Sequence, residues 1–100
     1  MDNYQLKIQQ QQQLRSQLIL TATKPTIQAD VVLKRLVQRA LRQLQRYGDA
    51  KATADQVARE LGYYLFCHQY QMPRAAYDLL VVAQAMYTPL TAPPLIRLSE

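Results

Sequence analysis

The chain has 100 residues, enough for one small domain around one hydrophobic core. Apolar residues make up 49% of the chain, an ordinary share for a globular protein. Only two glycines are present, and β-branched residues never alternate with polar residues over a strand-length run, which argues against a sheet with tight hairpins. Twelve Lys and Arg against seven Asp and Glu give a net charge of +5. This charge favours an anionic partner, either nucleic acid or the inner face of a membrane.

The cellular location is predicted from the cysteine content and the N-terminal segment. Cys67 is the only cysteine and cannot form an internal disulfide, so a reducing compartment is expected. The first apolar stretch, Leu18–Leu20, is too short for the core of a signal peptide, and no window has the length of a membrane span. We therefore expect a cytoplasmic protein.

A first helix is predicted over about residues 3–20. Glutamine is a fair helix former, so the run Gln9–Gln13 is compatible with it. The apolar stripe is sparse, and Gln11 falls on its core side, so this helix is expected to pack least tightly. It must end before Pro25, because the residue preceding a proline disfavours the helical conformation.

The second helix, predicted over about residues 28–47, has the clearest pattern in the sequence. At about 100° per residue, one of its faces is apolar throughout. That face comprises Leu33, Leu36, Val37, Ala40, Leu44 and Tyr47. The opposite face, called the arginine ridge below, comprises Arg35, Arg39, Arg42 and Arg46. Gly48 follows the last periodic residue, where a left-handed C-cap is expected.

The third helix is predicted over about residues 54–70, and Thr53 and Gln56 form a capping box at its start. Gly62 lies inside this helix and costs about 1 kcal/mol relative to alanine, which predicts close approach of a neighbouring helix there. The side predicted to be buried comprises Val57, Leu61, Tyr64, Leu65 and His68.

A fourth helix is predicted over about residues 73–87, with Pro73 in its first turn, where a missing N–H is no loss. Tyr77 and Val81 fall away from its predicted inner face. The tail over residues 88–100 contains three prolines yet is apolar, so it is expected to fold back on the helices or to meet a partner. Four helices with short connections predict an all-α, antiparallel up-down four-helix bundle, a single domain with a non-helical C-terminal tail.

The sequence offers little for catalysis. Cys67 and the only histidine, His68, diverge by about 100° on a helix, so we interpret them as a core-edge histidine beside a small buried thiol and not as metal ligands. Asp55 and Glu60 fall on different faces and do not form an acid–base pair. There is no glycine-rich phosphate loop and no nucleophile elbow. We expect no enzyme, no cofactor and no metal.

The arginine ridge has two interpretations: a contact for phosphate groups, or a solvated face that keeps the domain soluble. No aromatic residues are interleaved with these arginines, which argues against binding of single-stranded nucleic acid. The segment Thr53–Gly62 is similar to the first helix of a helix-turn-helix, but it continues into apolar residues with nothing to read base edges. A small DNA-binding or regulatory module is therefore the alternative, with nucleic acid an unlikely partner.

The segment Leu61–Pro73, with the amphipathic run to Leu80, resembles the immunity proteins that protect producers of pediocin-like bacteriocins, most of all the enterocin A immunity group. The shared pattern is a leucine, a Tyr-Leu-Phe core with a second aromatic residue, a short turn and a last helix. The resemblance covers about residues 33–87, and the chain length, positive charge and tail agree with it.

This resemblance implies a cytosolic four-helix bundle that acts by binding. Its partner would be the mannose phosphotransferase permease, whose membrane subunits hold the bacteriocin, and the bound immunity protein would block pore opening. The C-terminal half would decide which bacteriocin is countered. The corresponding positions are Tyr77, Val81, Tyr87, Leu90, Leu95, Ile96, Arg97 and Leu98. Apart from the resemblance, the charge of the arginine ridge favours a contact with the anionic inner leaflet at the membrane face.

Overall fold

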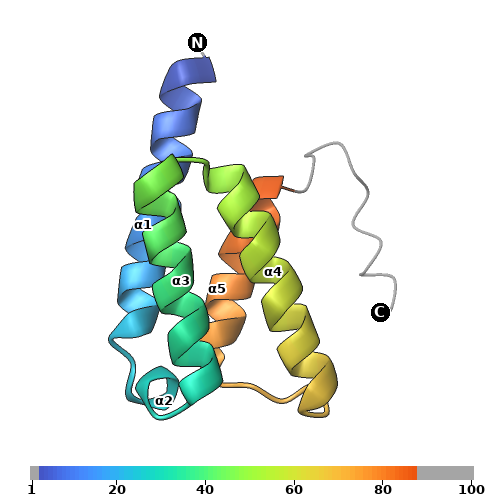
Figure 1. The fold of residues 1–100 in the computed structure, drawn as a ribbon. Coiled ribbons are helices and arrows are strands. Elements are labelled where there is room, and N and C mark those ends of the chain that lie inside the picture. Colours follow the sequence, from blue (N-terminus) through green and yellow to red (C-terminus); the bar gives the residue numbers. More distant parts are fainter. Residues whose placement is uncertain (1–2, 88–100) are drawn as a thin grey trace.

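The computed structural model describes residues 3–87, which form a bundle of four long helices and one short helix. The elements are α1 (Asn3–Ala22), α2 (Pro25–Gln28), α3 (Val31–Tyr47), α4 (Ala50–Cys67) and α5 (Arg74–Tyr87). The four long helices alternate in direction, and α2 closes the end of the bundle between α1 and α3 (Figure 1). The predicted all-α antiparallel bundle is confirmed, whereas the tail over residues 88–100 lies outside the described residues.

The connection between α1 and α3 differs from the prediction of one helix beginning at 28. Pro25 begins the short helix α2, because its fixed φ and missing N–H suit a first helical position. A new helix then begins at Val31. Asp30 has an extended backbone and accepts hydrogen bonds from the amides of Val32 (3.0 Å) and Leu33 (3.1 Å), so its carboxylate satisfies two of the free donors at the start of α3.

The connection between α3 and α4 confirms one predicted cap and corrects another. Gly48 is left-handed, with φ of 65°, as predicted for the end of α3. The predicted capping box at Thr53 is wrong, since α4 already begins at Ala50 and Asp49 caps it by accepting from the Ala52 amide at 3.0 Å. Thr53 is instead buried inside α4, and its hydroxyl has no hydrogen-bond partner among residues 3–87.

The turn between α4 and α5 also shifts two predicted boundaries. Gln69 and Tyr70 have φ of 58° and 62°, and this left-handed pair ends α4 at Cys67 instead of 70. Pro73 lies just before α5, and its carbonyl accepts from the amides of Ala76 (2.9 Å) and Tyr77 (3.2 Å). The helix therefore begins one residue later than predicted.

One continuous core fills the bundle, and α1, α3, α4 and α5 all contribute to it. The predicted apolar face of α3 is buried except at Tyr47, whose side chain is 71% exposed. The sparse stripe of α1 is confirmed, because only Leu14, Leu18 and Thr21 are buried along that helix in the part whose burial is described. Gln11 is half-buried, as predicted, and its amide donates to the Gly48 carbonyl.

Replacing each of the two glycines by alanine is expected to change the stability of the bundle in opposite directions. An added Cβ at Gly48 would combine positive φ with a 3.2 Å approach to the Gln11 amide, so Gly48→Ala should destabilise the bundle by about 1 kcal/mol or more. At Gly62 an added Cβ meets nothing within 4 Å. The predicted close helix approach there is wrong, and Gly62→Ala should stabilise by about 0.5–1 kcal/mol. Urea unfolding of the two variants checks the opposite signs; two shifts of the same sign would contradict the assignment.

Candidate binding surface on α3 and α4

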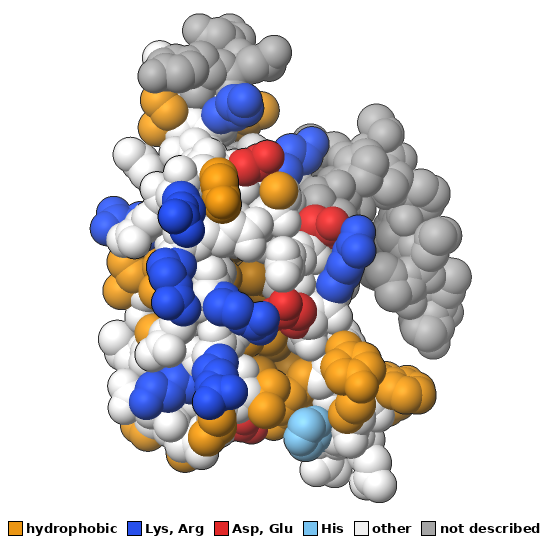
Figure 2. Space-filling view, in the orientation of Figure 1, with side chains coloured by type: hydrophobic (Ala, Val, Ile, Leu, Met, Phe, Trp, Pro, Cys, Tyr) orange, Lys and Arg blue, Asp and Glu red, His pale blue; other side chains and the backbone are white. Residues whose placement is uncertain are grey.

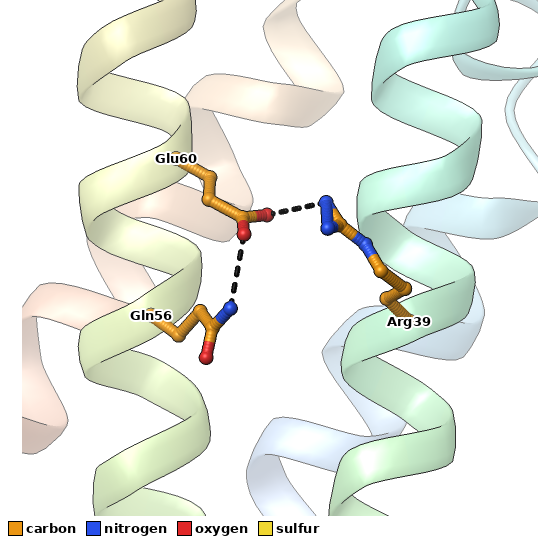
Figure 3. Close-up of polar contacts among 3 residues, drawn as sticks. All are labelled: Arg39, Gln56 and Glu60. Atoms are coloured by element: carbon orange, nitrogen blue, oxygen red, sulfur yellow. Dashed lines mark hydrogen bonds and ion pairs between the residues drawn. The ribbon is translucent and has the colours of Figure 1, made fainter.

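The arginine ridge forms an exposed column along α3, as predicted (Figure 2). Arg39 is its innermost member toward α4, where its guanidinium donates to Glu60 at 2.9 Å. The second oxygen of Glu60 accepts from the Gln56 side chain at 3.0 Å, so this carboxylate is held from two helices (Figure 3). The Arg39–Glu60 pair thus ties α3 to α4 halfway along their length, while remaining open to solvent.

The other basic side chains of this face differ in how they are neutralised. Arg59 on α4 pairs with Asp55 one turn earlier, at 3.0 Å. Arg35, Arg42 and Arg46 have no carboxylate within 4.0 Å among residues 3–87. These three arginines therefore present uncompensated positive charge to a partner.

Below the Arg39–Glu60 pair, a groove of about 480 Å³ lies between α3 and α4. Its apolar part contains Val32 and Leu36 on α3, with Tyr63, Tyr64 and Cys67 on α4. Arg39, Arg59, Glu60 and His68 complete its edge. Figure 2 shows this apolar band beside the arginine column, at the end of the bundle where α4 finishes.

The aromatic residues at the end of α4 are unusually exposed. Tyr63 is 71% exposed and Phe66 is 70% exposed, and they lie three positions apart on the same side of the helix. In the sequence these aromatic residues form part of a family pattern, which does not identify them as exposed. The available clue was a second apolar stripe on α4, outside the face formed by Val57, Leu61 and Tyr64.

Three side chains, those of Asp30, Tyr64 and His68, contact one another in sequence at the lower end of the groove. The Tyr64 hydroxyl donates to the Asp30 carboxylate, which joins the end of α4 to the start of α3. The His68 ring stacks on the Tyr64 ring at 3.8 Å between centroids, and its Nδ1 lies 2.9 Å from the Tyr64 carbonyl oxygen. His68 and Cys67 are both exposed, so the prediction of a core-edge histidine beside a buried thiol is wrong.

This arrangement shifts two ionisation equilibria. Burial of Tyr64, followed by its hydrogen bond to Asp30 and the negative charge there, raises the pKa of Tyr64 to about 12. Burial alone would raise the pKa of Asp30, but bonds from Tyr64 and from two backbone amides, with nearby His68, lower that pKa overall. The Asp30 carboxylate therefore stays ionised and Tyr64 stays neutral across the physiological range.

Of the residues predicted to determine specificity, Tyr77 and Val81 lie on a different part of the bundle. Tyr77 and Val81 lie away from the inner face of α5, as predicted, and are 38% and 64% exposed. The Tyr77 hydroxyl donates to the Tyr70 carbonyl at 2.8 Å, which fastens α5 to the turn after α4. Tyr87 ends α5, but its side chain lies outside the described residues, as do Leu90, Leu95, Ile96, Arg97 and Leu98.

The structure does not bring these α5 residues into one site with the arginine ridge. Both α3 and α5 pack against α1 and α4, so they occupy opposite corners of the bundle. Through the Arg39–Glu60 pair, the ridge adjoins the outer side of α4. A binding surface that includes the ridge is therefore built from α3 and α4.

Two further features bear on possible chemistry in the described range. Within residues 3–87, no three His, Cys, Asp or Glu side chains gather closely enough to hold a metal ion. None of the helices over the same range has both the length and the hydrophobicity needed to cross a bilayer. The helix containing Thr53–Gly62 runs without interruption to Cys67, so the predicted continuation past Gly62 is confirmed.

Comparisons of the chain with known protein families, with curated proteins and with solved structures find no match.

Proposed function

We propose that this chain is a bacteriocin immunity protein that acts by binding, from the cytosolic side, the mannose phosphotransferase permease occupied by a pediocin-like bacteriocin. The resemblance over Leu61–Pro73 supports the family. The observation that carries a binding role is the exposed surface on α3 and α4, where large aromatic side chains adjoin arginines. Aromatic residues and arginine are the types enriched where proteins bind one another.

The arginine ridge supports an additional role at the membrane face. The uncompensated arginines Arg35, Arg42 and Arg46 would attract the anionic inner leaflet, at about 1 kcal/mol for each charge near the surface. This attraction would concentrate the protein beside its membrane partner. It would add to protein binding without replacing it.

The test is protection of a sensitive lactic acid bacterium that expresses the chain and is challenged with a panel of pediocin-like peptides. Protection against at least one peptide is expected for the unmodified chain. Lack of protection against every peptide, at confirmed expression, would overturn the proposal. Steeply salt-dependent binding to duplex DNA under the same conditions would favour the alternative regulatory module.

The double reversal Arg42→Glu/Arg46→Glu is expected to weaken both protection and sedimentation with vesicles of anionic phospholipid. Neither arginine has a carboxylate partner among residues 3–87, so the bundle should remain folded. Lys7→Glu/Arg15→Glu on α1 is the matched control, because both residues are exposed and the net charge changes equally. Equal losses in the two variants would show that only net charge matters, not the ridge.

A further inference from the structure

The α3–α4 groove has the length of a site for a short helix. On α3 its lining runs from Val32 to Arg39, and on α4 and its C-cap from Arg59 to His68. At 1.5 Å per residue these spans correspond to about 10 and 14 Å, or two to two and a half helical turns. The groove lies between two antiparallel helices, and its floor residues Leu36 and Tyr64 are recessed and buried. A convex rod can reach this floor, whereas a flat bilayer surface cannot.

The walls of the groove hold side chains that a partner can cover. Val32 and Tyr63 are more than half exposed at its two edges, and exposed Phe66 extends the apolar surface on α4. Each loses water if a third helix packs between α3 and α4, which is the main source of binding free energy for an amphipathic helix in a groove.

Charge determines which kind of helix fits. A second hollow on α3 is lined by Val31, Val32, Arg35, Gln38, Arg39 and Arg42. It shares Val32 and Arg39 with the groove, so the apolar and basic surfaces are continuous. The carboxylate in the groove, Glu60, is already bonded to Arg39 and Gln56. A ligand lying in the groove would therefore extend one flank over Arg35 and Arg42, which favour carboxylates.

From this geometry we propose that the α3–α4 groove docks an amphipathic helix of a partner protein, with large apolar residues facing the groove and acidic residues facing Arg35 and Arg42. The inference rests on the proposed function only in that the chain acts by binding a protein. The docked segment needs apolar side chains at positions i, i+4 and i+7, which match the two-turn length of the groove. Its acidic flank sets the orientation.

The probe is a fluorescein-labelled helical peptide of about 14 residues with leucines at i, i+4 and i+7 and glutamates on one flank. A matched peptide carries lysines in place of the glutamates. Fluorescence anisotropy with the full chain is expected to show saturable binding of the acidic peptide and at least about tenfold weaker binding of the basic one. No saturable binding up to about 1 mM, or equal affinity for both peptides, would overturn the proposal.

Two tyrosines supply a matched pair of variants, since Tyr63 and Tyr47 are each 71% exposed and only Tyr63 lines the groove. Tyr63→Glu should lower the affinity for the acidic peptide at least about tenfold, whereas Tyr47→Glu should change this affinity less than about twofold. Circular dichroism of each variant confirms that the bundle is intact. Equal effects of the two substitutions would place the peptide elsewhere.

Cys67 gives an independent readout, because it is the only cysteine of the chain and lines the groove in exposed form. The bound acidic peptide should slow the alkylation of Cys67 by iodoacetamide. The control variant Cys67→Ser/Gln84→Cys moves the thiol to an exposed position on α5 and should show no slowing. Protection of Cys67 by anionic vesicles but not by the peptide would identify a lipid-binding surface and overturn the helix assignment.

The outcomes separate this inference from the immunity proposal. A chain that protects a host but does not bind the acidic peptide refutes the docking site alone. A chain that binds the peptide through Tyr63 but protects no host refutes the immunity function alone.

Discussion

Replacing Leu18 by alanine is expected to lower the free energy of unfolding by about 2–5 kcal/mol, the largest effect predicted for a single substitution in this bundle. The Leu18 side chain is 0% exposed and belongs to the continuous core. Its truncation removes buried methyl groups and leaves a cavity that four helices can only partly close. Since a domain of this size has about 5–15 kcal/mol of stability, the variant loses a large fraction of it.

Leu20→Ala on the same helix is the matched control, because its side chain is 50% exposed. Both substitutions remove the same atoms, and alanine is at least as good a helix former as leucine. Urea unfolding followed by circular dichroism should therefore give a shift of less than about 1 kcal/mol for Leu20→Ala. Comparable losses in the two variants would mean that α1 does not pack through the face containing Leu18.

The second large effect is expected for Asp30→Ala, which should lower the free energy of unfolding by about 2–3 kcal/mol. The substitution removes an N-cap that serves two amides of α3, which is worth about 1 kcal/mol. It also leaves the partly buried Tyr64 hydroxyl without its acceptor, and an unsatisfied donor removed from water costs about 1–3 kcal/mol. Asp49→Ala is the control, since Asp49 caps α4 through one amide bond. A loss at Asp30 no larger than at Asp49 would show that the Tyr64 bond adds nothing.

The same carboxylate predicts a pH dependence. The pKa of Asp30 in the folded chain lies below its ordinary value of 3.8, so its contribution is complete above that value. It is lost as the pH falls from 3.8 toward the lowered pKa, because the unfolded state then takes up the proton first. The stability difference between the unmodified chain and Asp30→Asn, measured by urea unfolding from pH 6 to pH 2, should shrink across this acid range. A difference that stays constant would contradict the ionised bond.

The helices could be predicted from periodicity, but their ends depended on choices that sequence alone does not resolve. Asp49 and Thr53 are both good N-cap residues, and the chain uses the earlier one because Thr53 then falls on the buried face of α4. The end of α4 depended on Gln69 and Tyr70 adopting positive φ, a conformation uncommon for these residue types. Gly48, by contrast, is the residue type that a left-handed cap requires.

Only one part of the candidate surface could be predicted from the sequence. The arginine ridge follows from spacing within one helix, so its prediction was confirmed. The groove depends on how α3 and α4 are placed relative to one another, and no pattern within either helix contains that information. His68 was assigned to the core edge because its spacing places it on the same helix face as Leu61 and Tyr64, and Cys67 was interpreted as a small buried thiol beside it. Instead α4 finishes at the edge of the bundle and exposes both.

The first turns of α1 extend beyond the other helices at the end of the bundle opposite the groove (Figure 1). Side chains there, such as Leu6 and Lys7, are exposed. A fusion partner or surface anchor attached ahead of α1 would therefore leave the α3–α4 face unobstructed. The attachment point and the candidate binding surface then lie toward opposite ends of the bundle. An N-terminally tethered chain is therefore the suitable format for capturing a partner.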